Sequence, residues 1–353
     1  MKIAMIREMG GNDMKPISLA LAAAFGLATM AQPGAAQDAV HLKLAHGYPA
    51  THFLWEHGVA RFVDRVAEQT GGKVTFEVFP NSQLGKDQLA LLSSGLADVA
   101  LLTPAIAGGK LPLTSVTELP GLFGTSCEAT RKFSEIAKEG GPLNEAEYKP
   151  LKLHVLYVLT VPPYTVITTK KPVASLADMS GLKIRVAGNA MTKTVGALGG
   201  VPVQIPGPEM FDALTRGTVD GALYSHMALP SLKLDQLFKY SVGGMSLGGG
   251  SVVLAMSDRA WEALPEDVKA AMNEAGPITE IESCSWQDEQ EASFSKELAE
   301  ERDWQIATLS PEEKAQWEAR ITEVAKDWAA EMESTGKPGD AILEAFRNAK
   351  GTE

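Results

Sequence analysis

The chain has 353 residues, too many for one small module, and two lobes with a crossed boundary are the first expectation. Hydrophobic residues make up 45% and charged residues 22%, a composition typical of globular proteins that excludes a largely disordered chain. The formal net charge is -12 and the acidic residues are spread along the chain, so neither nucleic acid nor an anionic membrane surface is expected as the main partner. An anionic ligand would therefore need a local positive group.

The amino-terminal segment has the order of a secretory signal. Lys15 precedes an apolar run from Ile17 to Met30, and small residues follow up to Ala36. This order predicts a signal peptide at residues 1–36, cleaved after Ala36, with Met14 as the expected true start. The mature chain is expected in the periplasm without direct membrane insertion, because no later run approaches the roughly 20 apolar residues of a membrane-spanning helix.

The two cysteines, Cys127 and Cys284, lie far apart in the sequence. Export to an oxidising compartment permits a disulfide between them. Two separate thiols fit the sequence equally well, because nothing in it fixes the distance between the two residues.

Alternating strands and helices are predicted for a first lobe at residues 37–160. Strand-like runs at Val40–Ala45, Lys73–Phe79 and Val99–Leu102 are separated by an amphipathic helix over Phe53–Glu68 and a second helix through Leu96. This alternation favours an α/β fold with a mostly parallel sheet and a ligand at the carboxyl ends of its strands.

Two crossings between lobes are predicted from the middle of the chain. The proline pair Pro162-Pro163 splits two strand-like runs, Leu153–Leu159 and Thr165–Thr169, and begins a second lobe at residues 161–245. Its expected elements are strands at Leu182–Val186, Val201–Ile205 and Gly221–Tyr224, and helices at Ala190–Leu198 and from Pro208.

Residues 246–275 are expected to return to the first lobe. The glycine run 248–250 leads there into the strand Ser251–Met256. Residues 276–353 are predicted as a long helix followed by C-terminal helices that pack on both lobes. The helices expected over this end of the chain are Glu266–Gly276, Pro277–Arg302 and a capped helix from Ser310 to Glu333.

Common enzyme signatures are missing from the sequence. It contains no G-x-S-x-G, H-E-x-x-H or Walker motif, so we expect neither catalysis nor a cofactor. His46, His52 and His57 are close in sequence, but their spacing does not place them on one helical face, and no metal site is expected. A secreted lyase or isomerase that uses His46 or His226 as a base stays open as an alternative.

Arg185 is the most informative single residue. In the predicted strand 182–186, Leu182, Ile184 and Val186 share one face, whereas Arg185 points to the other, close to the carboxyl end. A guanidinium is permanently charged and matches a carboxylate with two parallel hydrogen bonds. The position therefore predicts a carboxylate anchor, with Asn189 just beyond the strand end; a surface salt bridge is the alternative.

The segments Leu176–Val186, Phe211–Leu214 and Gly217–Gly221 resemble the solute-binding subunits of TRAP (tripartite ATP-independent periplasmic) transporters. The likeness extends over nearly the whole mature chain. It implies a two-lobed α/β fold of the periplasmic-binding-protein-like type II, with crossover strands and a long helix spanning both lobes. It also implies capture of a small organic acid and delivery to membrane permease subunits. A binding protein of an ABC importer or a sensor is the nearest alternative.

The resemblance assigns roles to individual positions. Arg185 matches the arginine that binds the ligand carboxylate in this family. Thr165 stands where several members have a second arginine, which disfavours a dicarboxylate or sialic acid, and Tyr224 stands where some have asparagine, with His226 close by. Gly207 replaces an aromatic residue of some members. Together with Tyr48 and Asn189, these positions predict a pocket for a bulkier, aromatic or keto acid stacked on Tyr224. Ordinary packing at the hinge between the lobes fits Tyr224 equally well.

Overall fold

The structure is a computed structural model that describes residues 39–107 and 109–351. The predicted signal peptide and the start at Met14 lie outside these residues. Two mixed sheets form the framework. Their strands are β1 (Val40–Ala45), β2 (Val74–Phe79), β3 (Val99–Leu102), β4 (Leu153–Thr160), β5 (Thr165–Thr168), β6 (Lys183–Val186), β7 (Val201–Gln204), β8 (Gly221–Tyr224), β9 (Tyr240–Gly243), β10 (Ser251–Ser257) and β11 (Gln305–Thr308).

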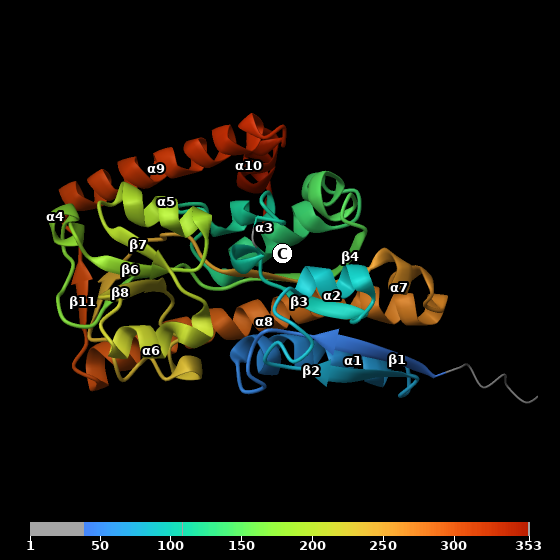
Figure 1. Ribbon diagram of the computed structural model, residues 1–353. Coiled ribbons are helices and arrows are strands. Elements are labelled where there is room, and N and C mark those ends of the chain that lie inside the picture. Colours follow the sequence, from blue (N-terminus) through green and yellow to red (C-terminus); the bar gives the residue numbers. More distant parts are fainter. Residues whose placement is uncertain (1–38, 108, 352–353) are drawn as a thin grey trace, which may run out of the picture. The chain divides into compact units, whose positions relative to one another are not determined.

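Helices surround both sheets (Figure 1). The α-helices are α1 (Ala60–Gln69), α2 (Gln88–Ser94), α3 (Ser126–Ala137), α4 (Leu176–Met179), α5 (Asn189–Ala197), α6 (Met210–Thr215), α7 (Asp258–Glu262), α8 (Glu266–Glu301), α9 (Pro311–Ser334) and α10 (Gly339–Asn348). The shorter helical turns that matter for the site are η1 (Trp55–Val59) and η3 (Thr114–Glu118). None of the helices in the described ranges is both long and apolar enough to cross a membrane.

The first sheet has the strand order β2-β1-β3-β10-β4. β1 runs parallel to β2 and β3, whereas β10 is antiparallel to both β3 and β4. The expectation of a mostly parallel sheet is therefore wrong for this part of the chain. The reason is that β10 enters from the other sheet, so its direction is set by that crossing and not by a βαβ connection.

The second sheet has the order β11-β9-β5-β8-β6-β7. β6 is parallel to β7 and β8, and β5 is antiparallel to β8 and β9. The edge strand β11 corrects the expectation that residues 276–353 form helices throughout. Its four residues pair with β9 far away in the sequence, which no local periodicity could indicate.

The two crossing segments predicted around the proline pair and the glycine run lie side by side. The Val161 N–H donates to Gly250 O at 2.9 Å, and the Tyr164 N–H donates to Gly248 O at 2.7 Å. Gly248 has φ of 100°, and a Cβ there would lie 2.1 Å from Glu118 O. The backbone path therefore requires glycine at this position for both its dihedral angle and its close contact.

Helix α8 is longer than predicted. It begins at Glu266 and continues through Pro277, where the sequence indicated a break. Proline removes one intrahelical hydrogen bond, but Pro277 and Asn273, whose carbonyl loses that bond, are both exposed, so water can satisfy the carbonyl. The result is one helix of 36 residues that contacts η1, α1, α3 and β4.

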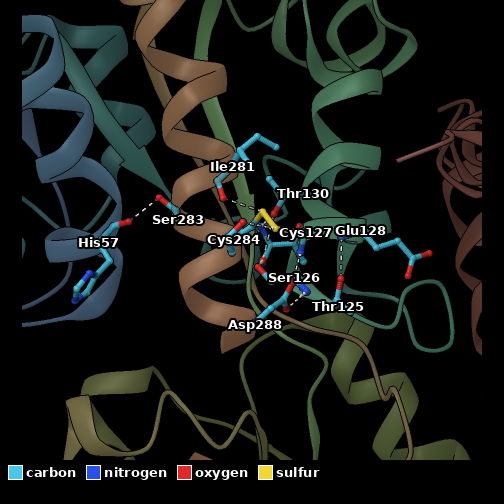
Figure 2. Close-up of a disulfide and its surroundings, with 12 residues drawn as sticks. His57, Thr125, Ser126, Cys127, Glu128, Thr130, Ile281, Ser283, Cys284 and Asp288 are labelled. Carbon is cyan, nitrogen blue, oxygen red and sulfur yellow. Dashed lines mark hydrogen bonds between the residues drawn. A yellow bond between two sulfur atoms is a disulfide. The ribbon is translucent and has the colours of Figure 1, made fainter. Parts of the chain in front are cut away.

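Cys127 and Cys284 form a disulfide, which settles the alternative that the sequence left open. The bond joins the first turn of α3 to the middle of α8 (Figure 2). Beside it, the Asp288 carboxylate of α8 accepts hydrogen bonds from the Ser126 and Cys127 N–H groups at 2.7 and 3.0 Å. On the other side of α8, the Ser283 hydroxyl donates to His57 O at 2.6 Å. These contacts fix α8 against the elements of the first sheet.

Candidate functional site

A cavity of about 590 Å³ lies where the carboxyl ends of strands from both sheets meet. β1 and β3 of the first sheet, and β6 and β8 of the second, lead into loops or end in residues that line it. Most of the lining is apolar or aromatic. Among its residues are Tyr48, His52, Phe53, Leu101, Thr103, Ile106, Tyr164, Arg185, Met191, Tyr224 and Leu232, with Lys86, Asp87 and Lys110 also contributing.

Arg185 supplies a buried positive charge in this cavity. Its side chain belongs to β6 and is 3% exposed, and its Nε–H donates to Ile205 O at 2.7 Å. Burial lowers the pKa of the guanidinium, yet arginine stays charged in proteins because its ordinary pKa is so high. No carboxylate within residues 39–107 and 109–351 forms an ion pair with Arg185. The guanidinium is therefore available to an anion that enters the cavity.

Three tyrosines surround this charge. The Arg185 Cζ lies 5.8 Å from the centre of the Tyr224 ring, and the rings of Tyr164 and Tyr224 are 5.4 Å apart. The hydroxyl of Tyr48 lies 3.0 Å from Thr103 Oγ1. Burial raises the pKa of Tyr224 to about 12 and also raises the pKa of Tyr48 and Tyr164. All three are therefore neutral phenols, and the ring faces favour the neighbouring cation.

Tyr164 was not identified from the sequence. Its position directly after Pro162-Pro163, in the predicted crossing, was the available signal, because residues of a crossing segment lie between the lobes. Gly250 leaves room for its hydroxyl, because a Cβ at Gly250 would lie 2.6 Å from that oxygen.

Two imidazole rings, those of His52 and His46, lie close to Tyr48 in the sequence, and the His52 ring lies 4.5 Å from the Tyr48 ring. His52 is 2% exposed, and burial lowers its pKa to about 3. His46 is fully buried, stacks on Trp55 with ring centres 4.8 Å apart, and has its pKa lowered by burial to about 4. Both rings are therefore neutral near pH 7. His57 lies apart from them and stacks on Trp286 of α8.

Glu118 is a buried acid near the tyrosines. It ends η3 and is 1% exposed, and within the described residues both of its carboxyl oxygens are buried without a hydrogen-bond partner. Burial raises its pKa to about 8, although the nearby Ala105 amide lowers it in part. When Glu118 is ionised, its negative charge adds to the rise in the pKa of Tyr48 and Tyr164. At pH 7 the carboxyl is mostly protonated, so it does not oppose an anionic ligand.

Three of the residues predicted from the sequence do not line the cavity. Asn189 is exposed at the start of α5 and accepts a hydrogen bond from Gln204 Nε2 at 3.1 Å. Thr165 is buried within the second sheet, and its hydroxyl donates to Val242 O. His226 contacts α8 through its Nδ1, which lies 3.1 Å from Glu291 Oε1 and 2.8 Å from Ser295 Oγ. Arg185, Tyr224 and Tyr48 do line it.

The loops from the two sheets touch beside the cavity. A Cβ at Gly188, which follows β6, would lie 2.8 Å from Ala105 O, in the loop after β3. The absence of a side chain at Gly188 thus allows the two loops to meet.

Comparison with known proteins supports the same architecture. Residues 44–331 match the model of a family described as bacterial extracellular solute-binding protein, family 7. A TRAP solute binding protein from Rhodoferax ferrireducens, whose crystal structure is described as a complex with copurified benzoate, has 25% identity and a TM-score of 0.78, covering 88% of this chain and 97% of that one. The predicted two-lobed α/β fold is confirmed.

Two curated relatives show how far the likeness extends. The C4-dicarboxylate-binding periplasmic protein DctP of Rhodobacter capsulatus is 27% identical over 278 residues, covering 77% of this chain and 81% of the relative. The uncharacterized protein y4mM of Sinorhizobium fredii is 31% identical over 294 residues, covering 77% of this chain, but the chain spans only about half (52%) of that relative's length. Since the family model covers most of the chain, this protein belongs to the bacterial extracellular solute-binding proteins of family 7, as the TRAP-like sequence segments indicated.

Proposed function

We propose that this solute-binding protein captures a small aromatic carboxylic acid and delivers it to the membrane subunits of a TRAP transporter in the periplasm. The observation that carries the proposal is the buried Arg185, which has no acidic partner in the described chain and faces a largely apolar cavity with Tyr164 and Tyr224 in its lining. A carboxylate would satisfy the guanidinium, and a ligand without one would leave a buried charge unpaired.

The rest of the cavity favours an aromatic monocarboxylate over a short dicarboxylate. A second carboxylate in a closed cavity would need a second buried cation. Lys86 is exposed, and Lys110 is already paired with Asp87. The faces of Tyr48, Tyr164 and Tyr224 offer apolar area for a ring instead. Benzoate in the Rhodoferax ferrireducens structure is the ligand type that this lining supports, and the DctP relative's dicarboxylate fits it less well.

Binding without turnover is part of the proposal. Of the two bases considered for an enzyme, His46 is fully buried with both ring nitrogens enclosed, and His226 contacts α8 outside the cavity. A general base must reach its proton within hydrogen-bond distance. Neither histidine meets that condition for a ligand held at Arg185.

Titration calorimetry with benzoate, benzamide and succinate tests the ligand class. We expect benzoate to bind, and benzamide, which has the same ring without the charge, to bind at least 100-fold more weakly. Arg185→Ala should weaken benzoate binding by about 100-fold or more, since losing one partner of a buried ion pair costs about 3–5 kcal/mol.

Arg216→Ala is the matched control, because Arg216 is an exposed arginine outside the cavity, with a side chain 77% exposed. Its benzoate affinity should stay within twofold of the unmodified protein. Equal affinity of the Arg185→Ala variant for benzoate, or equal binding of benzamide, would contradict the proposal.

A further inference from the structure

His52 lies just before the helical turn η1, which starts at Trp55, and is held by its own backbone contacts. Its carbonyl accepts hydrogen bonds from the Trp55 and Glu56 N–H groups at 2.8 and 3.0 Å. Its ring Nδ1 accepts a third, from the Leu54 N–H at 3.3 Å. The imidazole thus accepts a local backbone N–H just ahead of η1.

This contact fixes the tautomer of the ring. A nitrogen that accepts a hydrogen bond from an N–H group carries no proton, so the neutral ring of His52 has its proton on Nε2. The low pKa of His52, which burial causes, keeps the ring from gaining a second proton near neutral pH.

The ring is also fixed in orientation, with one edge accessible. The rings of Tyr48 and Phe53 lie 4.5 Å from it, centre to centre, and His52 lines the cavity. Both nitrogens of His46 are fully enclosed, but Nε2 of His52 is not. Because His52 lines the cavity, its Nε2 is accessible from there. No side chain or backbone group of the described residues accepts a hydrogen bond from it.

We propose that the Nε2–H of His52 donates a hydrogen bond to a ligand oxygen remote from the carboxylate. The inference rests on the proposed function and narrows the ligand to an aromatic acid whose ring carries a hydroxyl or carbonyl group. Arg185 extends from the second sheet, whereas His52 follows β1 of the first. A ligand bound at both residues therefore bridges the two halves of the site, and an unsubstituted ring leaves the donor unpaired, which disfavours its binding.

Affinities for benzoate, 3-hydroxybenzoate and 4-hydroxybenzoate test this inference. We expect at least one hydroxybenzoate to bind the unmodified protein about 10-fold more tightly than benzoate. In His52→Phe, which keeps a flat ring and removes the donor, the ratio of hydroxybenzoate to benzoate affinity should fall below twofold. His57→Phe is the control, because His57 is outside the cavity, and it should keep the full preference.

A second measurement, on the unmodified protein, tests the role of His52 even if the His52→Phe variant does not fold. In imidazole-optimised ¹H–¹⁵N NMR spectra of the unmodified protein, the Nε2–H signal of His52 should move with the preferred hydroxybenzoate and not with benzoate. Equal affinities for all three acids, a preference that survives in His52→Phe, or an unmoved Nε2 signal would each overturn the role of His52. If the unmodified protein bound none of the acids, or if Arg185→Ala bound them normally, the proposed function itself would fail.

Discussion

Glu118 shows how burial changes the chemistry of a single residue. As an ordinary exposed acid it would be negative at pH 7 and would repel a ligand carboxylate. Enclosed near Tyr48 and Tyr164, it has its pKa raised to about 8 and is mostly neutral at that pH. The pKa values of the tyrosines are raised, and those of His46 and His52 are lowered. Between pH 7 and 9, therefore, neither the tyrosines nor these two histidines titrate, whereas Glu118 does.

This environment predicts a pH dependence of ligand binding. As the pH rises from 7 to 9, Glu118 loses its proton, and benzoate affinity should fall by about 3–10-fold, because an added negative charge near Tyr48 and Tyr164 acts on the ligand carboxylate through a low effective dielectric constant. Glu118→Gln should remove the dependence. Glu289→Gln, at an exposed position on α8, should keep it. If the benzoate affinity of the unmodified protein were the same at pH 7 and pH 9, the charge of Glu118 would have no effect on ligand binding.

At the scale of elements, the loop contact between Gly188 and Ala105 joins the two halves of the site. Gly188 precedes α5 and has an extended backbone with φ of -156°, so its conformation is open to any residue. The space around Gly188, however, leaves no room for a side chain, because a Cβ would lie 2.8 Å from Ala105 O and 3.1 Å from Ala105 Cβ. The two loops can meet only while neither carries a larger side chain at this point.

Gly188→Val should therefore separate the two loops and weaken benzoate binding by about 10-fold or more. Folding should be nearly intact, since the position is in a loop that can shift. Gly196→Ala, at a site on α5 with open space around the added methyl group, is the control and should bind normally. Unchanged affinity in the Gly188→Val variant would mean that the loop contact does not matter for binding.

For the whole molecule, the disulfide ties α8 to the elements around the first sheet. Cys127 and Cys284 are 157 residues apart in sequence, so the bond closes a long loop of the unfolded chain. A cross-link of this length limits the unfolded ensemble strongly. Neither cysteine lines the cavity, so the bond should affect stability more than ligand affinity.

Replacing both residues, as Cys127→Ser with Cys284→Ala, should lower the free energy of unfolding by about 2–5 kcal/mol in urea titrations. Benzoate affinity at 25 °C should remain within twofold. The unmodified protein treated with dithiothreitol under unfolding conditions should lose a similar amount of stability. Equal midpoints for the oxidised protein and the variant would contradict a stabilising role of this bond.

Local sequence patterns were a good guide to single elements and a poor one to their partners. The runs ending at Ala45 and Leu102 were located because apolar residues in short runs between turns indicate strands. The break at Pro277 was misjudged, because whether a proline ends a helix depends on how its neighbours are packed and solvated. β11 was missed because its only signal is its pairing with β9.

The sequence by itself determined the family, the alternating α/β character and the placing of Arg185 near the carboxyl end of a strand, because these depend on local periodicity and on short motifs. Only the tertiary structure decided that Tyr164 and His52 share the cavity with Arg185, that His226 contacts α8 outside it, and that Cys127 meets Cys284. These outcomes depend on the paths of the crossing segments. Distances between residues far apart in the chain follow from packing of the whole molecule, which no local pattern encodes.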